Sequence, residues 1–188
     1  ITPNWDQAEE QTRLAFDEVG QALGAQSFPF NVAPAFADVW PWHATIMEAD
    51  IARHFHALYE RGRDRLSASL RGQIERGRQV SAVDYNNAVD RMQATSAAFD
   101  AIFDRCDAIL TAATAGPAPL GLESTGSPAF CTLWTFTGMP AVTLPLLRAG
   151  NGLPMGIQLV GRRGDDARLM RTARWLVDWV AGLESAAG

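Results

Sequence analysis

The apolar residues of the first hundred positions recur at helical spacing. Ala15, Val19 and Leu23 share one face of a helix that is predicted from residue 4 onward and that Gly24 is placed to end. The same pattern predicts further helices over residues 42–62, 64–77 (with glycine stops at Gly72 and Gly77) and 81–106. The last of these opens with Ser81 and Asp84 at the spacing of a capping box, and its apolar stripe comprises Val89, Met92, Phe99 and Phe103.

The pattern changes after Asp107. An apolar run at 108–114 predicts a short strand, and after a glycine- and proline-rich loop Ser127 is the predicted N-cap of a helix over 127–138. Further elements are predicted in order: β-rich runs at 141–147 and 156–161, then an amphipathic helix over 164–183 with a buried stripe of Leu169, Ala173, Leu176, Val177 and Val180. The chain is therefore predicted to be α/β, mainly helical over 1–105 and strand-rich with a terminal helix over 106–188.

Gly150, Gly152 and Gly156 have a spacing that hints at dinucleotide binding. A dinucleotide-binding loop, however, follows a strand and opens a helix whose N-terminus holds the pyrophosphate. Here a β-rich run follows the glycines and Pro154 interrupts them, so the context argues against a nucleotide site. We expect the glycines to permit a tight return between two strands.

Composition excludes several classes of function. The net charge is −5 and the arginines are scattered, which argues against a nucleic-acid partner. All 16 basic Lys+Arg residues are arginine, so no lysine base can come from this chain. No apolar run approaches the roughly 18 residues that cross a bilayer, so no membrane partner is expected. With two cysteines, a reducing cytoplasm is the expected location.

Local signatures of catalysis are weak. His54 and His56 point to different faces of a predicted helix, so we do not expect them to share a metal ion. Cys106 and Cys131 are expected to be small buried side chains rather than nucleophiles. No G-x-S-x-G sequence is present. Taken by themselves, the residues predict no catalytic group, no metal and no cofactor.

Several motifs in sequence order closely resemble the C-terminal part of the amidase signature hydrolases. They read DAILTAATAGPAP, then LWTFTGMPAVTLP, then GLPMGIQLVGRRGDDARLMRTA, and together they span residues 107–173. Two departures are mild. The first motif lacks the proline that is common after this strand in the family, and Thr135 stands where many relatives carry Asn.

The resemblance implies an amide hydrolase of α/β/α architecture, in which helices flank a large mixed sheet. It also implies a Ser–cis-Ser–Lys triad, in which the lysine deprotonates the bridging serine and backbone N–H groups stabilise the oxyanion before water releases the acid. In the family these parts lie in a Gly/Ser-rich loop of the N-terminal half, and none is present here. The chain, which begins at Ile1 rather than Met, is therefore expected to be the C-terminal part of a larger amidase domain and inactive alone.

An incomplete sheet leaves unpaired strand edges, so we expect the chain to pair with the missing N-terminal half or to self-associate. The resemblance also implies that the segment from the loop to the following helix lines the pocket for a small-molecule amide. The substrate-binding residues predicted in this way are Thr125, Ser127, Phe130 and Trp134. Plain packing is an alternative of equal weight for each, because aromatic residues at helical spacing are usually core.

Two other functions stay open at this stage. One is a non-catalytic interaction domain that has kept the fold and lost the triad. The other is the A-type subunit of a tRNA-dependent amidotransferase, which the acidic pI of about 5.1 and the lack of a basic patch weaken.

Overall fold

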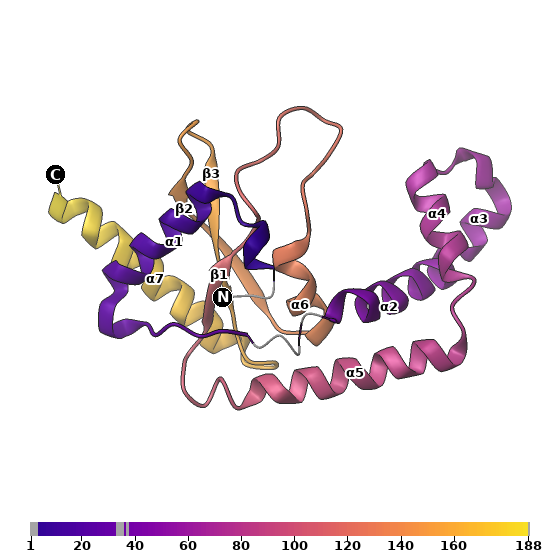
Figure 1. The fold of residues 1–188 in the computed structure, drawn as a ribbon, viewed down its shortest axis with the longest axis horizontal. Helices are drawn as coiled ribbons and strands as arrows, with labels where there is room; N and C mark the ends of the chain where they lie inside the picture. The colour runs from indigo at the N-terminus through magenta and orange to yellow at the C-terminus, as the bar shows by residue number, and fades with distance from the viewer. Residues whose placement is uncertain (1–3, 33–35, 37, 188) are drawn as a thin grey trace. The chain divides into compact units, whose positions relative to one another are not determined.

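The computed structural model describes residues 4–32, 36 and 38–187 (Figure 1). Close contacts divide the chain into two units, one formed by Ile1–Ala37 with Ser96–Gly188 and the other by Asp38–Thr95. The boundary at Thr95 falls inside a helix. The expectation that residues 1–188 form part of one larger domain stays a prediction.

The unit Asp38–Thr95 is helical throughout its regular structure. It contains α2 (Val39–His54), α3 (His56–Gly62), a short 3-10 turn at Arg63–Arg65, α4 (Ala68–Gly77) and most of α5 (Ala82–Asp100). The helix predicted over 42–62 is interrupted once, because Phe55 has φ −93° and ψ 5° and leaves the helical ladder. Gly77 ends α4 as predicted. Gly72 does not, because it lies inside that helix.

Two serines set the starts of α4 and α5. Ser67 Oγ accepts a hydrogen bond from the amide of Leu70 at 3.2 Å, and Ser81 Oγ accepts one from the amide of Asp84 at 3.1 Å. The Ser81 hydroxyl also donates to the Asp84 carboxylate at 2.7 Å. The predicted start of α5 is therefore confirmed. Its predicted end is wrong, because the helix stops at Asp100 and the chain continues in turns.

The unit that contains both ends of the chain is built on a three-stranded sheet. Its strands are β1 (Ile109–Ala112), β2 (Ala141–Arg148) and β3 (Pro154–Val160), in the order β1-β3-β2. Both pairs are antiparallel, and Gln158 in the central strand lies opposite Thr111 on one side and Thr143 on the other. The sheet that the resemblance implies is mixed, and the described strands contribute only antiparallel pairs to it.

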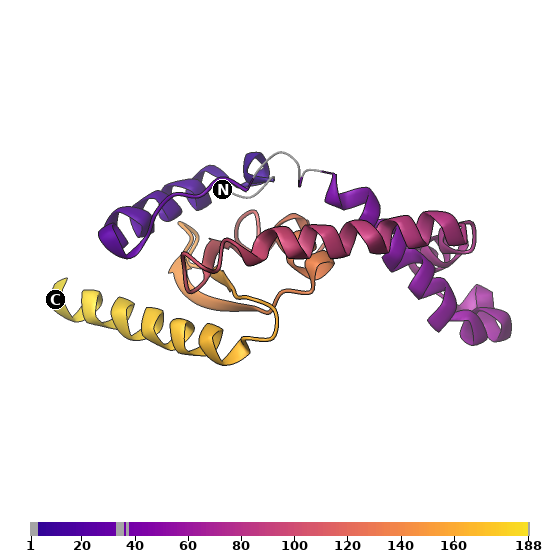
Figure 2. The same cartoon turned by 90° about the horizontal axis from the view of Figure 1, so that it is seen from below.

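One face of the sheet carries the main core of this unit. Leu110, Leu159 and Val142 lie opposite one another in the register and so share that face. They belong to one apolar cluster with Leu23 of α1 (Glu10–Leu23) and with three residues of α7 (Asp166–Ala187), namely Leu169, Ala173 and Leu176. Figure 1 and Figure 2 show α7 running along the strands.

The stripe of α7 is narrower than the sequence predicts. Leu169, Ala173 and Leu176 are buried, whereas Val177 is 37% exposed. The prediction that Val177 is buried is wrong, because it lies one residue beyond the stripe that faces the sheet. The N-terminal helix is also shorter than predicted at its start. A 3-10 turn at Trp5–Gln7 precedes it, and α1 begins only at Glu10.

Glycines act where the chain reverses or approaches itself. Gly138 has φ 65° and ends α6 (Ala129–Thr137) before the chain turns into β2. Gly152 has φ 84° in the β2–β3 turn, which the amide of Ala149 closes onto the carbonyl of Leu153 at 2.8 Å. A Cβ at Gly156 would lie 2.5 Å from Thr143 Cγ2. The glycines therefore serve a β-hairpin, as predicted.

Candidate functional site

The candidate site is the loop between β1 and α6, residues 113–128, together with α6 itself. Figure 1 shows this loop extending away from the three strands. Its middle is fully exposed, since Leu120 and Leu122 have relative exposures of 105% and 100%. Two leucines this open to solvent are unusual, because burying each side chain would gain about 2 kcal/mol.

The two polar residues that are predicted to contact the substrate lie on the limb of this loop that enters α6. Thr125 and Ser127 are both exposed. The Ser127 hydroxyl donates to Gln7 Oε1 at 3.4 Å and accepts a hydrogen bond from the amide of Ala129 at 3.3 Å. The prediction that Ser127 is the N-cap is wrong by one residue, because Pro128 is the N-cap and α6 begins at Ala129; the Ser127 hydroxyl still accepts a bond from the first amide of the helix.

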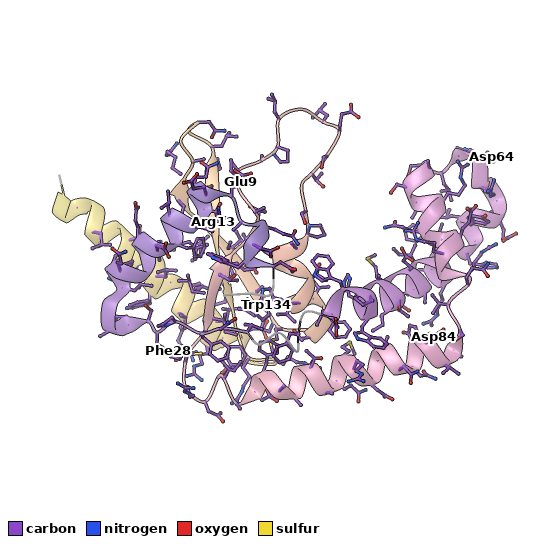
Figure 3. All side chains as sticks on the ribbon, in the orientation of Figure 1. Glu9, Arg13, Phe28, Asp64, Asp84 and Trp134 are labelled. Carbon is purple, nitrogen blue, oxygen red and sulfur yellow. The ribbon has the colours of Figure 1, made fainter. Side chains whose placement is uncertain are left out.

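The two aromatic residues that are predicted to contact the substrate lie in the core of the unit that contains both ends of the chain. Phe130 is 1% exposed and Trp134 is 2% exposed. Trp134 meets Phe99 edge-on, with ring centroids 5.5 Å apart, and Phe130 meets Trp5 edge-on at 6.1 Å. Figure 3 shows Trp134 among the side chains that surround α6. Within this chain both rings pack as core residues do, and their contact with a substrate stays a prediction.

A buried polar cluster beside α6 was not predicted. Gln158 and Thr111 face each other across β3 and β1, at 5% and 4% exposure. The Gln158 amide donates weakly to Cys131 Sγ at 3.8 Å, and the Cys131 thiol donates to the carbonyl of Ala113 at 3.5 Å. In the described part of the chain, Gln158 Oε1 and Thr111 Oγ1 have no hydrogen-bond partner. The only sign of this cluster in the sequence is that each of two apolar runs contains a polar residue, Thr111 in 108–114 and Gln158 in 156–161.

The N-terminal segment holds the base of the loop. The backbone amide of Glu9 and the hydroxyl of Thr12 both donate to the carbonyl of Ala115, each at 2.8 Å. Asn4 Nδ2 donates to the carbonyl of Ala129 at 3.1 Å. These contacts join residues more than a hundred positions apart, which is why local sequence patterns could not reveal them.

The thiol of Cys106 has a perturbed pKa. Burial raises the pKa of Cys106, and the neighbouring carboxylate of Asp107 raises it further, so this thiol is protonated at neutral pH. The sequence predicts that both cysteines are buried, but both are only half-buried. Among the residues that the structure describes, no three His, Cys, Asp or Glu side chains could together hold a metal ion. The site offers hydrogen-bonding groups and apolar surface.

The order of these elements defines the class of protein. A short strand, a glycine- and proline-rich loop, a buried helix, a β-hairpin and a long amphipathic helix make this an α/β protein. The sequence model of the family described as Amidase matches residues 3–170. The chain therefore belongs to the Amidase family.

Similar sequences and structures agree with this membership. A glutamyl-tRNA(Gln) amidotransferase subunit of the A type, from Neisseria meningitidis serogroup C (strain 053442), is 37% identical in an alignment of 91 positions that covers 43% of this chain and 19% of that protein. A crystal structure of an amidase superposes with a TM-score of 0.80 at 24% identity. A 6-aminohexanoate cyclic dimer hydrolase superposes with a TM-score of 0.67 at 20% identity.

The match covers this chain well and its relatives only in part. The amidase structure is matched over 92% of this chain and 42% of its own, and the cyclic dimer hydrolase over 95% and 42%. At these identities the superpositions establish the fold. In the described ranges, no helix combines the length and the apolar character needed to cross a bilayer.

Proposed function

We propose that this chain is the C-terminal, pocket-forming part of an amidase signature hydrolase. The complete protein would convert a carboxamide or acylamide into a carboxylic acid and an amine or ammonia. One observation carries the proposal: the Amidase family match spans residues 3–170, while a related amidase structure is covered over only 42% of its length. The Ser–cis-Ser–Lys machinery would then lie in the part of the domain that this chain does not contain.

The role of this chain would be to shape the acyl side of the pocket. Thr125 and Ser127 are exposed on the loop and would contact the substrate directly. Phe130 and Trp134 are buried in α6 and would form the apolar wall behind them. Such a division, in which polar groups orient a ligand against an apolar wall, is common in small-molecule sites.

The sheet supports a further part of the proposal. β1 and β2 are the outer strands, so each has one edge that no strand of the described chain covers. We expect these edges to pair with the remainder of the amidase domain or with a second copy of this chain. Sedimentation of the isolated chain tests this expectation, and a stable monomer at high concentration would contradict it.

Activity is tested by comparing the complete protein with this chain alone. We expect the complete protein to hydrolyse some members of a panel of amides that differ in acyl size, with release of the acid and the amine measured separately. The isolated chain should be inactive, because it contains no lysine and no Gly/Ser-rich catalytic loop. Binding of amides without turnover by the complete protein would favour the alternative of a non-catalytic interaction domain.

A second enzymatic function has its own support. The N. meningitidis relative at 37% identity belongs to a glutamyl-tRNA(Gln) amidotransferase, so this chain could be part of an A-type subunit. That function would require a tRNA-bound acceptor in the complex. Conversion of glutamyl-tRNA in the presence of glutamine, with no hydrolysis of free amides other than glutamine, would distinguish it from the amidase. A cytoplasmic location is expected under either function.

A further inference from the structure

The N-terminal segment 4–12 touches both limbs of the loop that carries the proposed substrate contacts. On the limb that leaves β1, the carbonyl of Ala115 accepts two hydrogen bonds, from the amide of Glu9 and from the hydroxyl of Thr12. The Glu9 carboxylate also lies directly against Gly116, where a side chain would collide with it. Figure 3 shows Glu9 beside this limb.

On the limb that enters α6, three contacts come from the same segment. Gln7 Oε1 accepts a hydrogen bond from the Ser127 hydroxyl at 3.4 Å, and Asn4 Nδ2 donates to the carbonyl of Ala129 at 3.1 Å. The ring of Trp5 packs edge-on against Phe130. One short stretch of chain thus fixes both ends of the loop.

The middle of the loop has no comparable support. Residues 118–126 are all exposed, and the glycines at 121 and 126 have φ 92° and 88°. The position of Thr125 is therefore set mainly at the two ends of the loop, because the chain between them makes few contacts that could restrain it.

Among the side chains that make these contacts, that of Thr12 is the most buried. Thr12 is 3% exposed, and its hydroxyl donates to the carbonyl of Ala115 in partly buried surroundings while also lying 3.8 Å from Met155 Sδ in β3. A hydrogen bond in such surroundings is partly shielded from competition with water. The bond between Gln7 and Ser127 is exposed.

We propose that Thr12 and Asn4 are positioning residues, which hold the β1–α6 loop in the position that the substrate pocket requires. Neither would touch the substrate. They would act through Ala115 and Ala129, and so through the placement of Thr125 and Ser127. The consequence for substrate selection rests on the proposed amidase function, whereas the control that Thr12 and Asn4 exert on the position of the loop does not.

Hydrogen exchange of the backbone amides tests the control of the loop. In Thr12→Val, which keeps the shape of the side chain and removes the hydroxyl, the amides of residues 113–116 should exchange roughly fivefold faster, the factor expected from one lost hydrogen bond. Asn4→Ala should have the same effect on the amides of residues 127 and 129–131. Amides of β3 and α7 should keep their rates in both variants.

Thr172→Val is the matched control, because in the described part of the chain the Thr172 hydroxyl bonds only the carbonyl of Arg168 in its own helix, at 3.1 Å. It should leave the exchange of the loop unchanged. Thr12→Ser, which restores a hydroxyl, should recover the slow exchange. Two results would overturn the proposal: unchanged amide exchange in the two limbs of the loop in Thr12→Val and Asn4→Ala, or an increase in the exchange rate of the same size in every element. If Thr12→Val does not fold, Asn4→Ala, at a less buried position, decides the question.

Kinetics of the complete protein then separate this inference from the proposed function. With an active amidase, Thr12→Val should change the ratio of kcat/KM between a small and a bulky acyl amide, while Thr172→Val leaves that ratio unchanged. Faster exchange in the loop with a constant ratio would remove the link to substrate selection. Faster exchange in a protein that hydrolyses no amide would uphold the control of the loop and contradict the proposed function.

Discussion

Gly77 in α4 packs directly onto the backbone of Glu48 in α2, with no room for a side chain between the two helices. A Cβ at position 77 would collide with the carbonyl group of Glu48 and would lie 2.9 Å from the Cβ of Ala52. The Arg76 guanidinium next to it reaches the Glu48 carboxylate at 2.5 Å. This contact holds the α2–α4 pair together at the point where α4 ends.

Gly77→Ala should therefore destabilise the unit Asp38–Thr95 by about 1–3 kcal/mol, because the helices must separate to admit a methyl group. Gly72→Ala on the same helix is the control. A Cβ there meets only the end of the Arg76 side chain at 3.4 Å, so the higher helix propensity of alanine should stabilise α4 by up to about 1 kcal/mol. Urea unfolding followed by circular dichroism measures both, and equal stability of the two variants would refute the close approach.

The second prediction concerns the pKa of Glu75. Its carboxylate accepts hydrogen bonds from the Tyr59 hydroxyl at 2.8 Å and from the Arg63 guanidinium at 2.6 Å, and both lower its pKa. Tyr59→Phe should raise the pKa of Glu75 toward its ordinary value, because the larger of the two causes is removed. A carboxyl-detected NMR titration measures the change.

Glu60 provides the comparison within the same experiment. Its pKa is lowered mainly by the hydrogen bond from Arg78, whose guanidinium lies over the ring of Tyr59. Phenylalanine keeps that ring, so the pKa of Glu60 should not move in Tyr59→Phe. A pKa of Glu75 that stays as low as in the wild type would show that Arg63 alone is sufficient.

The third prediction is a dependence of stability on pH through His43. Burial lowers the pKa of this half-buried histidine in α2 below its ordinary 6.5. As the pH falls below 6.5, the unfolded chain binds a proton that the folded chain does not, so the free energy of unfolding decreases until the lower folded pKa is reached. His43→Gln should reduce this loss at pH values below about 6.5. Parallel stability curves for the two proteins would contradict it.

The fourth prediction separates packing from substrate contact at the candidate site. Trp134→Ala should destabilise the protein by about 3–5 kcal/mol, because it removes a buried ring that packs against Phe99. Thr125→Ala, at an exposed position, should change stability by less than about 0.5 kcal/mol. Thermal unfolding and amide specificity of the complete protein, measured together, distinguish the two roles.

Loss of activity toward all amides in proportion to the lowered Tm would assign Trp134 to packing alone. A change in substrate preference in Thr125→Ala at constant Tm would support its place in the pocket. An unchanged preference in Thr125→Ala would contradict the prediction for the loop.

Much of the local structure followed from the sequence because its causes are local. Gly24 and Gly138 end helices, Ser81 starts one, and alternating β-rich runs form the hairpin at Gly152. The exceptions also have physical reasons. Gly72 does not interrupt α4, because one glycine costs a helix only about 1 kcal/mol and packing against α2 outweighs it.

The candidate site was predictable only in part. The motifs from Asp107 to Ala173 located the loop and α6, and with them Thr125, Ser127, Phe130 and Trp134. They left core packing and substrate contact equally weighted for the two aromatic rings, and they did not indicate that Gln158 and Thr111 form a polar cluster beside α6. Burial depends on which elements meet, and a helical spacing of aromatic residues is the same for a pocket wall and for a core.

The sequence by itself determined the family resemblance, the helices and the strands, and the absence of a lysine base, because these depend on residue identity and short-range spacing. Only the tertiary structure decided how the loop is held. The bonds from Glu9 and Thr12 to Ala115 and from Asn4 to Ala129 join parts of the chain more than a hundred residues apart. No local pattern carries such contacts, because they form only when the packed sheet brings α1 and β1 together.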